Sequence, residues 1–322
     1  MVFLIRYFVF MKNIIIYSLI ILLYSIVYAD NDKHTGDVSG QNFTSTSHVN
    51  SRWENVTADS SIFSTLTAKT DYTNAYFAYS TFTNADFSGA NLTNTYFNKS
   101  TFDNANFTDA IISHATFHGL CTKEQFYTTL SYRVGDLEGI NLGSNSIIGW
   151  DFRNQNLTQS NFSNSKISDV DFSNANLTNA NFIGSTFSNV NFTNANITGC
   201  DFYANGSLKK EMIYSTSNYK EKNINDVTIY EGSFCNSDFS EQNFSNVALY
   251  YLDLTGSSFK NANIKNTTFN NSILTNVDFT GATMSGDEDS AGLRLDMTIG
   301  FTKEQLYSTS SYKSGELIGI NF

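Results

Sequence analysis

The most regular feature of the chain is a bulky apolar residue that recurs every five positions between Tyr72 and Phe117. A small residue stands two positions before each of them, and the other three positions are mostly Asn, Asp, Thr, Ser or Gly. The pattern returns from Leu137 to Phe202 and from Ile224 to Met284. A period of five fits neither an α-helix, with 3.6 residues per turn, nor a flat strand, with a repeat of two. It predicts a coil of short straight faces with polar turns between them, each face pointing one large and one small side chain inward.

The number of faces in one turn follows from which residue types stack. Residues of one type align when each turn has four faces, so that every residue lies over the one 20 positions later. Three columns show this alignment: Leu137, Leu157, Leu177 and Ile197; Phe162, Phe182 and Phe202; Phe152, Phe172 and Phe192. A three-sided coil would instead mix Leu137, Phe152, Ile167 and Phe182 in one column. The sequence therefore predicts a four-sided solenoid of about nine coils, roughly 44 Å long at about 4.8 Å per coil.

Three copies of a second motif separate the repeat blocks, and they predict helical insertions near residues 121–132, 208–219 and 301–312. Thr122 with Gln125, and Thr302 with Gln305, have the spacing of a capping box, which predicts that a short helix begins at each threonine. The middle copy lacks this threonine. All three insertions leave and re-enter the solenoid at matching faces. They should therefore project from one side, about four coils or ~19 Å apart.

Two interpretations of these insertions stay open. Each helix is either a brace that lies on the coil with Phe126 and Tyr127 buried, or a docking element for a partner, because insertions in repeat proteins often mark the binding side. The candidate docking residues are the charged pair that opens each insertion: Lys123, Glu124, Lys210, Glu211, Lys303 and Glu304.

The segments 85–89 (Ala-Asp-Phe-Ser-Gly), 90–94 (Ala-Asn-Leu-Thr-Asn) and 175–179 (Ala-Asn-Leu-Thr-Asn) strongly resemble the pentapeptide-repeat family. The resemblance covers roughly residues 70 to 322 and implies a right-handed quadrilateral β-helix, an all-β solenoid. Family members dimerise end to end, which implies a homodimer through the C-terminal coil near Leu317–Phe322.

The resemblance also implies an alternative function, because some members mimic DNA and bind type II topoisomerases such as gyrase. In this chain the outward positions are mainly Asn and Thr rather than Asp and Glu. That composition argues against a DNA mimic.

The N-terminus has the pattern of a secretion signal. Arg6 and Lys12 supply positive charge, 14–27 is an apolar run, and 27–29 (Val-Tyr-Ala) has the small-residue pattern of a cleavage site. We therefore expect residues 1–29 to be a signal peptide and the mature protein to be secreted, periplasmic or at the cell surface. Contact with the membrane is expected only if this segment stays uncleaved.

The remaining chain divides into two predicted parts. Residues 30–70 are expected to form an irregular N-terminal region and cap, in which Trp53 covers the first coil. Residues 71–322 are expected to form the β-helix with its helical insertions.

Composition supports a chain made largely of paired backbone. Proline, which lacks the N–H that a β-ladder needs, is absent, and 28 Phe and 18 Tyr exclude a disordered chain. The net charge of −11 argues against direct binding of nucleic acid. Cys121, Cys200 and Cys235 are too few and too scattered for a disulfide framework, and Cys200 is expected to fill a small inward position.

Catalytic and metal-binding chemistry have little support in the sequence. His114, His118 and Cys121 are close in the chain, but a metal site needs three or four converging ligands. The other histidines, His34 and His48, precede the repeats, and no plausible nucleophile–base pair is present. We therefore expect no cofactor and no enzyme activity. The sequence predicts an exported, non-catalytic scaffold or interaction module that binds a protein partner.

Overall fold

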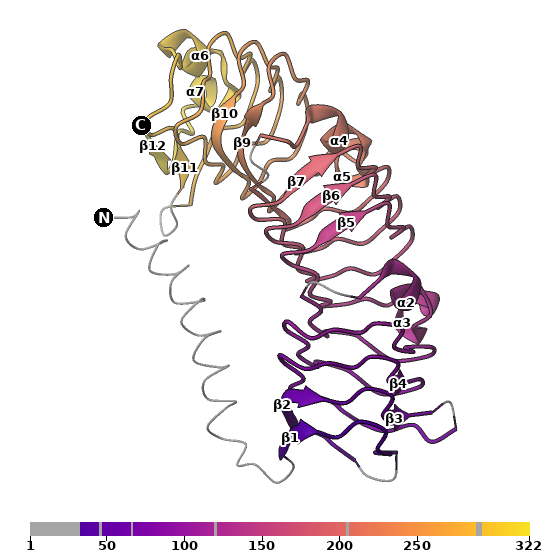
Figure 1. Ribbon diagram of the computed structural model, residues 1–322. Helices are drawn as coiled ribbons and strands as arrows, with labels where there is room; N and C mark the ends of the chain where they lie inside the picture. The colour runs from indigo at the N-terminus through magenta and orange to yellow at the C-terminus, as the bar shows by residue number, and fades with distance from the viewer. Residues whose placement is uncertain (1–32, 45–46, 66, 119–120, 204–205, 288–291) are drawn as a thin grey trace.

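The computed structural model describes residues 33–44, 47–65, 67–118, 121–203, 206–287 and 292–322. These residues wind into a parallel β-solenoid of about 11 turns (Figure 1). Most bridges between neighbouring coils join residues 20 positions apart, as in Asp136 with Asn156 and Asn141 with Asn161. The predicted fold class, a right-handed quadrilateral β-helix with short helical insertions, is confirmed.

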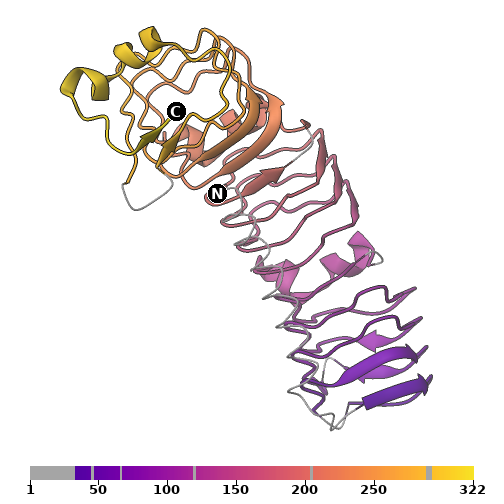
Figure 2. The same cartoon turned by 90° about the vertical axis from the view of Figure 1, so that its left-hand side faces the viewer.

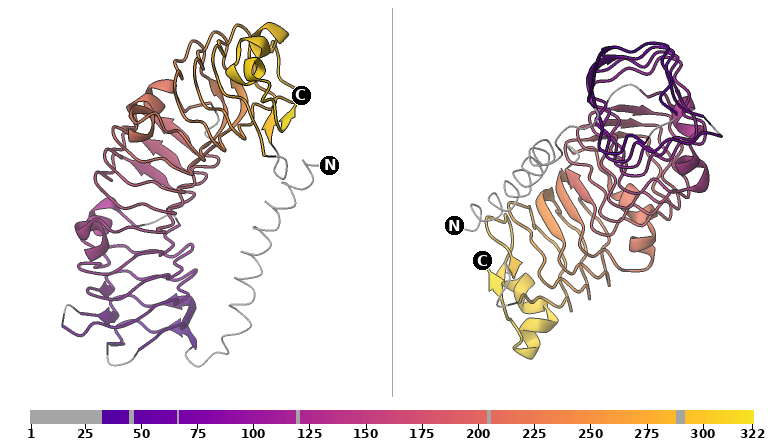
Figure 3. Two further views of the ribbon diagram at one scale, coloured as in Figure 1. Left: turned by 180° about the vertical axis from the view of Figure 1, so that it is seen from behind. Right: turned by 90° about the horizontal axis from the view of Figure 1, so that it is seen from below.

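Every pairing between the named strands is parallel. The strands are β1 (Lys33–Asp37), β2 (Arg52–Thr57), β3 (Ile62–Ser64), β4 (Asp86–Phe87), β5 (Ser146–Ile148), β6 (Lys166–Ser168), β7 (Thr186–Ser188), β8 (Asp201–Tyr203), β9 (Thr228–Ser233), β10 (Ala248–Asp253), β11 (Leu293–Arg294) and β12 (Ile320–Asn321). Figures 2 and 3 show the coils stacked along a curved rod.

The core is built from the columns that the spacing of 20 predicts. The rings of Phe152 and Phe172 stack with centroids 5.3 Å apart at 8°, and those of Phe162 and Phe182 stack at 5.2 Å and 6°. These side chains are fully buried, and burial of each large apolar side chain contributes about 1.5–3 kcal/mol. Cys200 is also fully buried at a small inward position, as expected.

Asparagine serves both the turns and the outer surface. Many turns end in a residue with positive φ, such as Asn174 and Asn194, because asparagine tolerates the left-handed conformation better than most residues. On the outer face the Asp171 carboxylate accepts from the Ser173 N–H at 2.8 Å. It also accepts from the Asn191 side chain on the next coil at 3.0 Å. This ladder explains why Asn, Asp, Ser and Thr dominate the outward positions.

Residues 33–64 differ from the irregular N-terminal region that the sequence suggested. β1 pairs with β2, β3 pairs with β4, and the bridges of β2 continue to Tyr76 and Thr81 in the repeat region. Trp53 is fully buried within the core, where it stacks on Phe77, and the first coil lies beneath it. The repeat pattern is hidden here because His34 and His48 stand among the inward residues and extra residues near 65–68 break the spacing. These coils account for the larger number of turns.

Among the described residues, six short helices form three pairs, one at each predicted insertion. They are α2 (Lys123–Tyr127), α3 (Leu130–Val134), α4 (Lys210–Ser215), α5 (Ser217–Lys220), α6 (Lys303–Ser308) and α7 (Ser310–Ser314). Figures 1 and 3 show α2 to α5 along the outer side of the curve and α6 and α7 near the C-terminal end of the rod.

Within the described part of the chain, no helix has the length and apolar character needed to span a membrane. The signal peptide expected at 1–29 lies outside the described residues.

Candidate docking site on the helical hairpins

Each helix pair replaces one strand on the same face of the solenoid. We call the pairs hairpin 1 (residues 122–135), hairpin 2 (209–221) and hairpin 3 (302–315). The face is marked by bridge residues that continue from coil to coil between the hairpins: Ile62, Asp86 and Asn106 before hairpin 1; Asp151, Asp171 and Asn191 before hairpin 2; Asp238, Ser258 and Asp278 before hairpin 3. The prediction that all three insertions share one side is therefore consistent with the register.

The first helix of hairpins 1 and 3 begins as the sequence predicts. Thr122 and Gln125 form a complete capping box, and so do Thr302 and Gln305. In hairpin 2, Lys209 stands at the N-cap without a side-chain hydrogen bond.

The second helix of every hairpin has a threonine cap that sequence reasoning missed. Thr129, Thr216 and Thr309 are buried, and the hydroxyl of each accepts from the N–H of the tyrosine three residues later. The same hydroxyl donates back to the first helix, for example from Thr129 to the Phe126 carbonyl at 2.8 Å. The repeated Thr-x-x-Tyr spacing was the available signal.

Below hairpins 1 and 3, a glutamine takes over the role of the missing strand. The Gln125 side-chain amide donates to the carbonyls of Phe102 and Ala105 at 2.6 and 2.9 Å. In hairpin 3, the Gln305 amide makes the same kind of bonds to the carbonyls of Leu274 and Val277, both at 2.9 Å. The Ala105 and Val277 carbonyls would otherwise lack the donor that the next strand supplies at this position, whereas the Phe102 and Leu274 carbonyls also accept from the N–H groups of Ala105 and Val277. An unpaired backbone group is costly.

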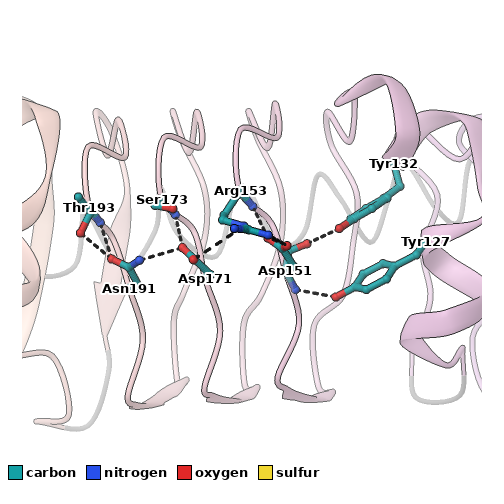
Figure 4. Close-up of polar contacts among 8 residues, drawn as sticks. All are labelled: Tyr127, Tyr132, Asp151, Arg153, Asp171, Ser173, Asn191 and Thr193. Atoms are coloured by element: carbon teal, nitrogen blue, oxygen red, sulfur yellow. Dashed lines mark hydrogen bonds and ion pairs between the residues drawn. The ribbon is translucent and has the colours of Figure 1, made fainter.

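Above hairpin 1, two tyrosine hydroxyls bind the backbone N–H and C=O of one residue in the next coil. The Asp151 N–H donates to the Tyr127 hydroxyl at 2.6 Å, and the Tyr132 hydroxyl donates to the Asp151 carbonyl at 2.8 Å (Figure 4). The two rings stack with centroids 4.4 Å apart. We call this arrangement a tyrosine clip. It supplies the acceptor and the donor that a strand would have offered.

Hairpin 2 has the same clip. The Asp238 N–H donates to the Tyr214 hydroxyl at 2.6 Å, and the Tyr219 hydroxyl donates to the Asp238 carbonyl at 2.8 Å. Partial burial and the neighbouring Tyr214 raise the pKa of Tyr219 to about 12, so this hydroxyl keeps its proton as a donor at neutral pH.

An exposed charged ladder continues from the clip of hairpin 1. Arg153 binds the Asp151 carboxylate at 2.6 Å and approaches the Asp171 carboxylate at 3.9 Å (Figure 4). The hydrogen bond from Arg153 holds the pKa of Asp151 below its usual value. Because this ladder is solvent-exposed, it contributes little to stability.

The six candidate docking residues lie at the first turn of α2, α4 and α6, one pair on each hairpin. Glu124, Glu211 and Glu304 are exposed, whereas Lys123 and Lys210 are half-buried. The Lys210 ammonium donates to the Cys235 carbonyl at 2.9 Å. The structure thus places the three pairs on separate coils, with exposed glutamates and with Lys210 acting as a brace.

The histidines and cysteines make no metal centre within the described residues. His118 is half-buried, and its Nδ1 lies 3.3 Å from the Asn98 side-chain oxygen. Burial raises the pKa of the Cys121 thiol to about 12, which makes it a poor thiolate ligand at neutral pH. The N-terminal His34 stacks on Trp53, and His48 stacks on Tyr72, so both are part of the aromatic packing of the first coil.

The geometry defines a parallel β-solenoid whose faces are five-residue units. The family described as pentapeptide repeats matches residues 71–109, 80–119, 136–174, 165–202 and 253–286, in eight copies. The chain is a member of the pentapeptide-repeat family.

The solved structures that the chain matches include two proteins with low sequence identity and low TM-scores. HetL, involved in heterocyst differentiation regulation in the cyanobacterium Nostoc sp. strain PCC 7120, is 14% identical, with 87% of this chain and 92% of that chain covered and a TM-score of 0.25. QnrB1, a plasmid-mediated fluoroquinolone resistance protein, is 15% identical in a trypsin-treated form, with 88% and 97% covered and a TM-score of 0.24. A comparison with curated proteins finds no match.

Proposed function

We propose that the protein is an exported, non-catalytic scaffold that binds a protein partner along the side that carries the hairpins. The observation that carries this proposal is the exposed glutamate at the start of each hairpin, Glu124, Glu211 and Glu304, on one face of the rod. The hairpins recur every four coils, which spaces them about 19 Å apart. Repeat scaffolds bind partners along such extended surfaces.

A binding role fits the chemistry of the surface better than catalysis does. The outward Asn, Asp and Thr side chains bond to one another along the ladder, as when Asn176 donates to Thr158 at 2.9 Å and Thr178 donates to Asn176 at 2.6 Å. Groups engaged in this way have little capacity left for substrate. The same pairing of carboxylates with amides supports a scaffold over a DNA-mimicking topoisomerase inhibitor.

The proposal of export rests on residues 1–29, which have the pattern of a signal peptide. Cell fractionation followed by N-terminal sequencing tests it directly. We expect a mature chain that begins at or near Asp30 in the secreted, periplasmic or cell-surface fraction. An uncleaved chain in the cytoplasm would overturn export and would make a gyrase inhibition assay the next experiment.

Association of two copies through the C-terminal coil is also part of the proposal. The described residues at that end include four exposed apolar side chains, which an end-to-end contact would cover: Met297, Ile299, Ile318 and Phe322. Light scattering tests this contact, and a strictly monomeric species would contradict it.

The docking surface is tested by site-specific photocrosslinking in cells. A photoreactive amino acid at Glu124, Glu211 or Glu304 should give crosslinked products. The matched position Glu231, which is also exposed but lies off the hairpins, should give none. Equal crosslinking from both sets, or none from the hairpins, would contradict the proposal.

A further inference from the structure

Four tyrosines gather on the face of the solenoid opposite the hairpins. The bridge residues of this face lie ten positions, or two sides of the four-sided coil, from those of the hairpin face. The sheet of β8, β9 and β10 presents Tyr203, Tyr230 and Tyr250 at one register position of three successive coils, and Tyr251 follows at the turn. Figure 1 shows β9 and β10 on the side of the rod away from α4 and α5. We call these four residues the tyrosine cluster, and it lies on the inner side of the curve.

The rings of the tyrosine cluster are inclined to one another rather than stacked. Tyr230 meets Tyr203 at 64° with centroids 4.3 Å apart, Tyr250 at 46° and 5.9 Å, and Tyr251 at 45° and 4.9 Å. Inclined rings cover less of one another's faces than stacked rings do. The Tyr251 side chain is 43% exposed, and the other three are half-buried.

An earlier pair of tyrosines on the same face shows the closed arrangement. Tyr76 and Tyr96 stack at 13° with centroids 5.0 Å apart, and Arg52 lies 5.1 Å over the Tyr76 ring. The faces of this pair are thus covered by the neighbouring ring and by a cation. Among the described residues, no lysine or arginine lies over Tyr230 or Tyr251 in this way. The tyrosine cluster therefore keeps aromatic surface on which a ligand can pack.

Tyr251 is held in a backbone conformation that a bulky residue rarely adopts. Its φ is 56°, in the left-handed region, where asparagine is the most frequent residue other than glycine in the described turns. Strain of this kind persists where the surrounding structure holds it, and it clusters at ligand sites. Because the side chain is exposed, core packing does not explain the tyrosine. The turn favours asparagine at this position, and binding through the ring accounts for the tyrosine.

The rest of the inner face supplies neutral hydrogen-bonding groups. From Asn141 to Asn270, the bridge residues and the residues two positions later are uncharged except for Asp201, in a chain of net charge −11. The side-chain amides of Asn161 and Asn181 donate no hydrogen bond to a described residue. On a neighbouring face, by contrast, asparagine amides donate to the threonines of the coil before at 2.9 and 3.1 Å. The inner face thus offers amide donors that the other ladder uses internally.

We propose that the tyrosine cluster binds an uncharged polysaccharide that lies along the inner side of the curve. A pyranose ring has an apolar face of C–H groups that packs on aromatic rings, and its hydroxyls bond to amides and phenols. The cluster supplies rings on three coils about 4.8 Å apart, and Asn181 and Asn161 continue the row with amides. Asp201 and Glu231 border the rings and disfavour an acidic polymer.

A neutral polysaccharide matches this face better than a protein does. The centre of a protein interface is apolar and desolvated. Here the rings alternate with amide, hydroxyl and carboxylate groups, such as those of Asn181, Thr228 and Asp201. The site lies opposite the hairpins and goes beyond the docking surface proposed there, so either proposal can fail without the other.

Affinity electrophoresis of the protein as recovered from cells tests the site, in gels that contain hydroxyethylcellulose, glucomannan or arabinoxylan. These polymers are soluble and uncharged, and at least one of them should retard the protein. The double variant Tyr230→Ala/Tyr251→Asn should bind that polymer roughly ten-fold more weakly, because two ring contacts are lost. Retardation by carboxymethylcellulose alone, which carries carboxylates, would overturn the proposal.

The single variant Tyr251→Asn separates binding from folding. Since asparagine suits the left-handed turn, the variant should unfold at a temperature no lower than the unchanged protein and still bind the polymer more weakly. The matched control is Tyr79→Asn. Tyr79 has the same φ of 56° and is 46% exposed, but Lys99 lies over its ring at 5.4 Å, so its replacement should leave retardation unchanged.

Two results would overturn the proposal directly: no retardation by any uncharged polymer, or equal retardation of the unchanged protein and a Tyr230→Ala/Tyr251→Asn variant that circular dichroism shows to be folded. Sedimentation velocity adds a further decision. Self-association that the double variant abolishes would identify a second copy of the chain as the occupant and would also overturn the assignment to a polysaccharide.

Discussion

Hairpins 1 and 2 attach to the solenoid with unequal support. Their clips are alike, since both hold an aspartate backbone at 2.6 and 2.8 Å. Hairpin 1 adds a capping box at Thr122 and two bonds from Gln125 to the coil below. Hairpin 2 has Lys209 and Met212 at these two positions, and neither residue makes an equivalent bond.

The contacts that the two hairpins share are distinct from those that only hairpin 1 has. Both hairpins keep two backbone hydrogen bonds to the coil below. In hairpin 1, for example, the Leu130 N–H donates to the Ala110 carbonyl at 2.9 Å, and in hairpin 2 the Ser217 N–H donates to the Ala195 carbonyl at 3.0 Å. The backbone thus secures the lower side in both cases. On the upper side the backbone of Asp151 or Asp238 faces helices, so only side chains of the right length can reach it. The clip is the contact that both hairpins share on this side.

The largest effect is expected from the buried residue of the first helix. Phe126→Ala should lower the free energy of unfolding by about 3–5 kcal/mol, because it leaves a cavity beside Trp150 and Phe117. Ile213→Ala in hairpin 2 should cost about 2–5 kcal/mol, toward the lower end because fewer atoms are removed. Urea denaturation followed by circular dichroism measures both. The control is Leu306→Ala in hairpin 3, which should cost clearly less, and an equal loss would contradict the packing argument.

The next effect concerns the clips themselves. Replacing both tyrosines of one clip with phenylalanine leaves an N–H and a C=O of the next coil without partners. Each double variant, Tyr127→Phe/Tyr132→Phe or Tyr214→Phe/Tyr219→Phe, should lose about 1–3 kcal/mol. Hydrogen exchange at the amides of Asp151 and Asp238 reports the local opening. We expect faster exchange in the hairpin 2 variant, since that hairpin has less support, and the reverse order would refute the comparison.

Substitutions that give one hairpin the residues of the other should have a smaller effect on stability. Gln125→Met should destabilise hairpin 1 by about 1 kcal/mol, because two carbonyls lose a donor. Lys209→Thr/Met212→Gln should install a capping box in hairpin 2 and stabilise it by a similar amount. Thermal unfolding of the two variants beside the unchanged protein measures both shifts. A neutral result for the hairpin 2 variant would mean that its first helix does not need the cap.

The sequence was sufficient for the fold because the inward positions repeat with little variation. The stacking of Phe152 on Phe172 follows from a spacing of 20, and the capping box at Thr122 follows from its local pattern. The coils of residues 33–64 were missed, because His34 and His48 do not match the apolar repeat although they occupy inward positions.

The candidate site was only partly predictable. The sequence located the charged pairs, but it could not show that Lys210 bonds to the next coil while Glu211 stays exposed. Nor could it show that Tyr127 and Tyr132 converge on Asp151, since that contact joins residues about one coil apart through two side chains. Contacts of this kind depend on the orientation of the hairpin, which the repeat does not encode.

The smallest effect is a pH dependence confined to hairpin 1. The hydrogen bond from Arg153 lowers the pKa of Asp151 in the folded protein. A lowered folded pKa gives stability that is present above the unfolded pKa of about 4 and is lost as the pH falls through the folded value. The variant Arg153→Gln should therefore be slightly less stable than the unchanged protein at pH 6.5, and the two should converge at pH 2.5. Hairpin 2 has Ser240 at the corresponding position, so Ser240→Ala should show no such convergence. Urea midpoints at the two pH values decide the matter, and a difference that persists at pH 2.5 would show that Arg153 acts through packing rather than through charge.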